Sequence, residues 1–442
     1  MTEAQALERA QIAVELAREA GADAAEATVS VARRFHAEAR ETTVSKLEQS
    51  VGKTLSVRLF VDGRKASLAT SDFSERAMRG ALERTVAQAR FVAADEFAAL
   101  PDRFAGDCPD LALFDPAIAQ RDGEPRVEDA LELERLIRSD ARIVNSSGSH
   151  YQDAVSITAI ATSTGFSGSY TSTRAGRSTG PVALDGEIKR TAHYGTAARR
   201  FDELESLETV ARVAARRATA LFGARKPPTG PCTVIFERDV AAQVLDDVFG
   251  AVSAANVSVG NSWLIGRAGE RVGSDVVTIV DDGRMPGKLG SSPFDGEGVA
   301  TQRTVVFERG VLKSFLYDTY YARKLGAAST GSSTGSGIGT ANFYLEPGAA
   351  ALDDLIASTQ RGVLVLDTIG FATEHASGTY SRGARGLFIE RGEVTHAVDE
   401  FTIAGTYGEI LAGIDAVAND LRFDSPVASP SFRVAQMTIS GN

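Results

Sequence analysis

The spacing of apolar residues changes between two periods along the first seventy positions. Over residues 4–20 the apolar residues recur every three to four positions, the period of a helix with one apolar face. Over residues 27–32 and 54–70 they alternate with polar residues, the period of a half-buried strand. The dipeptide Asp62-Gly63 interrupts the second run and tolerates the positive φ of a tight turn. The pattern predicts a helix, a strand and a β-hairpin.

The rest of the chain combines longer helical patterns with many short strand-like runs. Residues 150–200 alternate small polar and apolar side chains, which is typical of an antiparallel meander. Helices are predicted over residues 74–92, 128–138, 202–222, 238–252, 320–326 and 409–420. The chain lacks the regular strand–helix alternation of a Rossmann fold. The predicted fold class is therefore α+β, rich in strands, with antiparallel and mixed sheets and flanking helices.

We expect the chain to form two domains. Its 442 residues exceed the length that one ordinary hydrophobic core supports. Pro227-Pro228 follow the last helical pattern of the first half and cannot continue a helix. We therefore predict an N-terminal α+β domain over residues 1–225 and a C-terminal β-rich domain over residues 226–442.

Charge and cysteine content narrow the classes of function. The net charge is −11 and no run of Lys and Arg forms a stripe, so the electrostatic footprint of nucleic-acid binding is missing. Cys108 and Cys232 are far apart and lie in no metal-binding spacing, which fits a reducing compartment. No stretch approaches the ~20 apolar residues of a membrane span. We expect a cytoplasmic protein that binds neither nucleic acid nor membrane.

Residues 329–343 read STGSSTGSGIGTANF and contain two motif-like patterns. GSSTG would make Ser333 a nucleophile, but a nucleophile elbow needs a strand before it and a helix after it, and neither flank fits. GSGIG would cradle a phosphate, but no Lys follows and a strand-like run replaces the required helix. Two interpretations remain: a flexible surface loop, or a loop whose small side chains let an extended ligand approach the backbone closely.

Clustered carboxylates form no catalytic motif on their own. Asp281-Asp282 and Asp295 with Glu297 lie in segments typical of turns. Asp246-Asp247 are neighbours on a predicted helix, where adjacent side chains diverge by about 100°, so they cannot readily hold one ion. The polar side of that helix is expected to face solvent or a partner. It comprises Asp239, Gln243 and Asp246.

A series of segments in the second half resembles one known family. They are GNSWL (260–264), DDGRMPGKLGSSPFDGEGVATQRTVVFERGVL (281–312), YYARKLGAASTG (320–331), SGTYSRGARGLFIERGEV (377–394), EFTIAG (400–405) and IDAVANDLRF (414–423). In this order they are similar to the TldD/PmbA family, also called TldD–TldE or modulators of DNA gyrase. The resemblance extends over nearly the whole chain. It implies a two-domain subunit of a cytoplasmic metallopeptidase assembly that trims unstructured peptides by proteolysis.

The chain departs from the metal-bearing type of this family. In the family, TldD-type chains carry an HExxxH motif and a later cysteine that together hold zinc, whereas TldE/PmbA-type chains lack the motif. Here the corresponding helix reads DVAAQVLDDVFGAV, and Gln243, Val244 and Val248 occupy the position of the lost metal motif. No cysteine follows Cys232. The resemblance therefore implies a zinc-less TldE/PmbA-like subunit, with no catalytic or metal-binding residues and no cofactor of its own.

The same resemblance assigns partners and a candidate binding site. Zinc is expected only in a TldD-type partner that forms a heterodimer with this chain, or the chain pairs with itself as a homodimer. The C-terminal domain would supply the dimer surface and the cavity wall. An unfolded peptide substrate would lie against the loop that follows ARKLG. Its expected contact residues are Ser329, Thr330, Gly331, Ser332, Gly335 and Gly337.

Two alternatives stay open. The first is a stand-alone homodimeric protein that binds a peptide or another ligand without protease activity. The second is an enzyme active by itself through a metal held by His375, His396 and carboxylates. A lone histidine is more often structural than metal-binding, and the chain lacks the HExxxH motif, so we expect it to be inactive alone.

Overall fold

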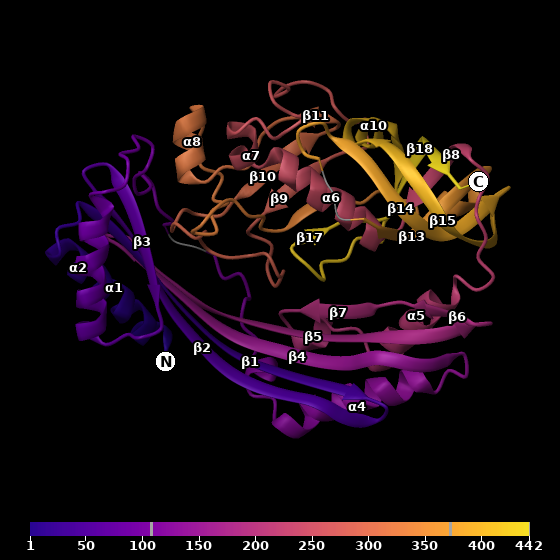
Figure 1. Ribbon diagram of the computed structural model, residues 1–442, viewed down its shortest axis with the longest axis horizontal. Coiled ribbons are helices and arrows are strands. Elements are labelled where there is room, and N and C mark those ends of the chain that lie inside the picture. Colours follow the sequence, from indigo (N-terminus) through magenta and orange to yellow (C-terminus); the bar gives the residue numbers. More distant parts are fainter. Residues whose placement is uncertain (107–108, 371–373, 442) are drawn as a thin grey trace.

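The computed structural model describes residues 1–106, 109–370 and 374–441. Within these ranges the first half builds one antiparallel sheet in the order β3-β2-β1-β4-β5-β6, with β7 paired to β5. Figure 1 shows its long strands as one curved layer, with the second half of the chain on the inner side. The strands are β1 (Ala24–Arg40), β2 (Thr43–Val61), β3 (Arg64–Thr70), β4 (Ile143–Thr162), β5 (Ser167–Asp185), β6 (Ile188–Thr191) and β7 (Tyr194–Ala198).

Helices cover the outer side of this sheet because one face of the strands is apolar. Alternate residues of β1, such as Ala25, Ala27 and Val29, are fully buried with apolar residues of the N-terminal helix. Figure 1 places α1, α2 and α4 on the side away from the second half. The helices of this half are α1 (Glu3–Glu19), α2 (Glu75–Ala89), α3 (Pro116–Ala119), α4 (Gly123–Arg138), the short 3-10 helix η1 (Phe201–Glu203) and α5 (Leu207–Thr219).

The second half contains two further sheets around a shared core. One has the order β11-β10-β9-β12-β17 and the other β15-β14-β13-β8-β18-β16. The strands are β8 (Gly230–Phe236), β9 (Ile279–Asp282), β10 (Arg303–Glu308), β11 (Val311–Leu312), β12 (Phe343–Leu345), β13 (Arg361–Ile369), β14 (Thr379–Glu390), β15 (Glu393–Thr406), β16 (Ile414–Val417), β17 (Val427–Ala428) and β18 (Phe432–Ser440). The helices are α6 (Arg238–Val252), α7 (Ala254–Ser258), α8 (Thr319–Leu325), α9 (Leu352–Ala357) and α10 (Tyr407–Gly413).

The predicted α+β class is confirmed, including the mixture of sheet types. The first sheet is wholly antiparallel, whereas β8 runs parallel to β13 and β12 runs parallel to β17. The hairpin turn at Asp62-Gly63 is confirmed by φ values of 49° and 71°. The proposed division at residues 225 and 226 lies between β7 and β8 and stays a prediction.

Several predicted elements differ in extent, among them the helix predicted over 202–222, which begins at Leu207, and two of them show the physical reason. The strand predicted over residues 27–32 is part of a strand of 17 residues, because β2 and β4 pair with it along nearly its whole length. The helix predicted over 409–420 ends at Gly413, where Ile414 turns extended and starts a strand paired with β18. Pairing with neighbouring strands decided both outcomes.

Cys232 is a buried free thiol, and burial raises its pKa to about 11. Cys108 lies outside the described residues. None of the described helices combines the length and the hydropathy that crossing a membrane would require.

Candidate functional site

A cavity of about 760 Å³ lies where the inner face of the first sheet meets loops of the second half. Glu26, Thr28 and Ser30 of β1 line it, because alternate residues of a strand point to one face. The opposite wall is formed by residues 292 and 294–296 and by the tip of the glycine-rich loop, residues 333–336. Both halves of the chain therefore enclose this space.

A second cavity, of about 520 Å³, adjoins the first. The two share Arg58, Lys65, Gly335 and Ser336 in their linings. Tyr320 on α8 contributes to the second cavity, and its hydroxyl donates to Asp95 of the first half. The tip of the glycine-rich loop therefore lies between the two adjoining cavities.

A buried charge network joins the two halves beside these cavities. Arg58 Nη2 lies 2.7 Å from Glu26 Oε2, and Arg58 Nη1 lies 2.9 Å from Glu297 Oε1. Burial raises the pKa of Glu26, although Arg58 opposes the shift. Burial lowers the pKa of Arg58, but its two carboxylate partners more than reverse this, so the group stays charged. Thr319 N also donates to Glu297, which ties α8 to the network.

Asp295 holds the glycine-rich loop in place. Its Oδ2 accepts from Ser333 N at 3.0 Å, and its Oδ1 accepts from the backbone of Glu297 and Val299. Burial, followed by the nearby Glu297, raises the pKa of Asp295 to about 7. The turn predicted for residues 295–298 is confirmed by the bond from Gly298 N to Asp295 O. This turn is also part of the cavity wall.

The six loop residues expected to contact peptide fall into two groups. Gly335 and Gly337 line the cavities. The others pack within the second half: Thr330 exchanges backbone and side-chain hydrogen bonds with Tyr317, and a Cβ on Gly331 would lie 2.4 Å from Ala300 O. The interpretation as a surface loop is wrong for the buried segment Thr330–Ser333, because its polar groups bond inward. The inward-packed group comprises Ser329, Thr330, Gly331 and Ser332.

Helix α6, where the resemblance places the lost metal motif, turns its aliphatic side chains inward. Val244 and Val248 are buried in the main core of the second half. Gln243 is exposed, and its Oε1 accepts from Thr368 Oγ1 at 2.9 Å. Gln243 and Asp239 line a cavity of about 620 Å³ whose other wall includes His193 of the first half. The polar side of α6 thus faces the inner side of the first sheet.

Asp247, next to the predicted polar side of α6, is bonded within the second half. Its carboxylate accepts from Tyr407 Oη at 2.7 Å and pairs with Arg382 at 2.9 Å. This pairing links α6 to α10 and β14. A structural role for Asp247 follows from these bonds.

The histidines of the second half lie in separate places. His375 packs against Gly250 of α6, where a Cβ would lie 2.2 Å from its ring. His396 on β15 stacks on Phe388. Among the described residues, one group of three side chains satisfies the distances of a metal site. That group is His36, Glu38 and His150, which sequence analysis did not single out.

Contacts between β1 and β4 bring this histidine group together. His36 and Glu38 are two residues apart on one face of β1, a weak signal that the sequence does contain. His150 is more than one hundred positions away, and only the strand register places it opposite Glu38. Spacing rules for metal motifs cannot detect such a group.

Three family models match the chain in consecutive segments. They are the PmbA/TldA metallopeptidase domain 1 at residues 25–93, the central domain at residues 117–222 and the C-terminal domain at residues 229–441. Together they extend over all three described sheets.

Relatives of known name and structure agree with these models. A metalloprotease PmbA homolog of Haemophilus influenzae is 31% identical over 434 residues, covering 97% of this chain and 95% of the relative. Metalloprotease PmbA of Escherichia coli O157:H7 is 30% identical over 395 residues, covering 88% of this chain and 85% of the relative.

Two solved structures share the fold. A Bacteroides thetaiotaomicron protein described as a candidate modulator of DNA gyrase has a TM-score of 0.92 at 28% identity, covering 98% of each chain. TldE of Thermococcus kodakarensis has a TM-score of 0.89 at 22% identity, which shows likeness of fold alone, and covers 98% of this chain and 100% of that one. The sequence relatives, the domain models and the fold agree that the chain belongs to the PmbA/TldD metallopeptidase family.

Proposed function

We propose that this chain is the zinc-less, TldE/PmbA-like subunit of a cytoplasmic two-component metallopeptidase. It binds an unstructured peptide while a zinc-bearing TldD-type partner cuts it. The observation that carries the proposal is the chemistry of α6. Zinc sites use imidazole, thiolate or carboxylate ligands, whereas Val244 and Val248 are aliphatic and buried in the core.

The lining of the main cavity suits a peptide of unspecified sequence. Nine of its 21 lining residues are Ser or Thr, whose small hydroxyl-bearing side chains can donate and accept and impose little on the shape of a ligand. Tyr170 and Phe294 add apolar surface, and Lys65 adds a positive charge that suits a peptide carboxylate. The hydroxyl-bearing residues are Thr28, Ser30, Ser56, Ser67, Thr158, Ser292, Ser333, Thr334 and Ser336.

Replacement of Ser336 by tyrosine tests the peptide-binding part of this proposal. Ser336 is exposed and lines both adjoining cavities, so a large side chain there would occupy the space without entering the core. With a TldD-type partner present, we expect Ser336→Tyr to reduce turnover of a fluorogenic unstructured peptide about tenfold or more while the complex stays intact by size-exclusion chromatography.

Ser71→Tyr is the matched control, because Ser71 is exposed and lines neither of these cavities. Equal turnover by both variants would remove the loop tip from the peptide site. Co-expression with a TldD-type chain tests the partnership separately: a stable 1:1 complex supports it. A chain that stays a homodimer and still binds peptide would instead support the stand-alone binding protein.

A further inference from the structure

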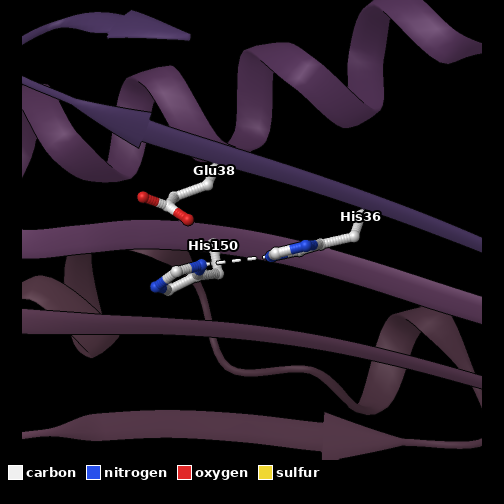
Figure 2. Close-up of side chains that lie close together, drawn as sticks. All are labelled: His36, Glu38 and His150. Carbon is white, nitrogen blue, oxygen red and sulfur yellow. Dashed lines mark hydrogen bonds between the residues drawn. The ribbon is translucent and has the colours of Figure 1, made fainter. Parts of the chain in front are cut away.

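His36, Glu38 and His150 converge on the inner face of the first sheet (Figure 2). Glu38 and His150 are direct partners in the β1–β4 register, so their side chains share a face. His36 lies two residues before Glu38 on that same face, while the intervening Ala37 is buried toward α4. This is the face that carries Glu26 and the cavity described above.

The ligand atoms of the three side chains lie close enough to meet at one ion after small side-chain rotations, which would replace the hydrogen bond between the two stacked imidazoles. His36 Nε2 and His150 Nδ1 are 3.2 Å apart, and one ligand atom from each of the three residues lies within 4.8 Å of the others. Two nitrogens that are each ~2.1 Å from one Zn²⁺ in a roughly tetrahedral arrangement are themselves ~3.4 Å apart. An ion could therefore be bound with little movement of the backbone.

Two β-bulges lie next to the group and orient it. In β2, Ser45 is the extra residue between the pairs Glu38–Lys46 and Ala39–Val44. Its hydroxyl donates to Glu38 Oε1 at 2.9 Å, and this hydrogen bond restricts the orientation of the carboxylate.

The second bulge provides room. In β4 the pairing with β5 shifts between Ser146 and Ser149, and Gly148 there has φ of 124°. A Cβ on Gly148 would lie 3.2 Å from Glu38 Oε1 and 3.3 Å from His150 Nε2. A glycine at this position leaves the space between the two side chains open.

An ion could reach the three side chains from solvent. All three residues are only half-buried. A cavity of about 310 Å³ adjoins His36, and Glu48, its partner in the β1–β2 register, lies in the lining together with Arg34 and Arg174.

We propose that His36, Glu38 and His150 form a binding site for a divalent first-row transition ion such as Zn²⁺, separate from the catalytic zinc motif that α6 lacks. Two imidazoles and one carboxylate satisfy three positions and leave at least one open toward the inner face of the sheet. Water or an oxygen of a peptide would occupy that open position. The site is separate from the proposed peptide cavity, since ten residues of extended strand between Glu26 and His36 measure ~33 Å.

Metal titration of the full-length, untagged chain tests this proposal. We expect apo protein to bind about one equivalent of Zn²⁺ by isothermal titration calorimetry, and Co²⁺ to give visible d–d absorption of a nitrogen- and oxygen-ligated ion. Glu38→Gln keeps the shape of the side chain and removes its charge, and it should weaken Zn²⁺ binding at least ~10-fold. Ser45→Ala, which removes only the orienting hydroxyl, should weaken it less.

His396→Ala is the matched control, because His396 stacks on Phe388 outside this group. Circular dichroism and the melting temperature of each apo variant establish that it is folded. The proposal is overturned if the wild-type chain binds no Zn²⁺ above background. It is equally overturned if a folded His36→Ala/His150→Ala double variant binds Zn²⁺ as tightly as the His396→Ala control.

Discussion

Two aspartates of the second half, Asp281 and Asp295, are buried with carboxyl pKa values raised to about 7. Loss of solvent is the main cause for both, because a charged carboxylate loses its hydration there. Asp281 accepts from Ala341 N at 2.8 Å, and Asp295 accepts from three backbone groups. Asp295 therefore holds the glycine-rich loop at Ser333, and Asp281 holds it near its other end at Ala341.

Asp281→Asn should change how stability depends on pH. The folded-state pKa lies above the ordinary 3.8, so the stability contribution of Asp281 is complete below pH 4 and is lost as the pH rises toward 7. Asparagine does not ionise and keeps an acceptor for Ala341 N. We expect the melting temperature of the variant to exceed that of the wild type by on the order of a few degrees at pH 8, and by less at pH 4.

Scanning calorimetry at both pH values measures this difference. Asp102→Asn serves as the control, because the Asp102 side chain is 87% exposed. A difference between variant and wild type that stays constant from pH 4 to pH 8 would contradict the assignment.

At the scale of elements, local sequence patterns predicted which helices and strands exist better than they predicted where each one begins and ends. The hairpin at Asp62-Gly63 followed from turn chemistry and alternation alone. The continuation of β1 through Arg33-Arg34 could not be predicted in this way, because these charges interrupt the alternation of apolar and polar residues. Pairing with β2 on one side and β4 on the other keeps the backbone extended there. Glu26 and Ser336 line the same cavity, and no local pattern can indicate that residues about three hundred positions apart share a lining.

The glycines of the loop differ in what they tolerate. Gly331 has φ of 68° and a Cβ there would lie 2.4 Å from Ala300 O, whereas Gly337 has open space around it. Gly331→Ala should therefore lower the free energy of unfolding by about 1–3 kcal/mol. Gly337→Ala should change it by less than about 0.5 kcal/mol.

Urea denaturation of the two variants in parallel tests this contrast. Similar midpoints for both would mean that the close packing of the loop against Ala300 does not contribute to stability.

At the scale of the molecule, each large apolar core stays within one half, and the halves are joined by polar side chains together with contacts of Phe294 with Phe166 and Tyr170. Arg199 of the first half donates to the backbone oxygens of Lys288, Leu289 and Ser291. Arg58 bridges Glu26 and Glu297 in surroundings where all three side chains are at most 13% exposed. A buried charge that loses its partner is costly, so each of these arginines is hard to replace.

Arg58→Ala should destabilise the chain by about 3–5 kcal/mol, because it leaves two buried carboxylates without their cation. Arg79→Ala removes an exposed pair with Glu19 and should cost at most about 1 kcal/mol. Urea midpoints measured by fluorescence and by circular dichroism report the difference. Equal midpoints for the two variants would show that the buried network contributes little.

The unbroken pairing of β1 with β4 has a consequence for how this protein can change in length. From Glu26 to Ala39 the register with β4 does not shift. One residue inserted between Glu26 and His36 would rotate the histidine and Glu38 through half a turn, against α4, while Glu26 kept its place in the cavity. Two inserted residues would return His36 and Glu38 to the inner face of the sheet. Within this stretch, natural insertions and deletions should therefore come in even numbers.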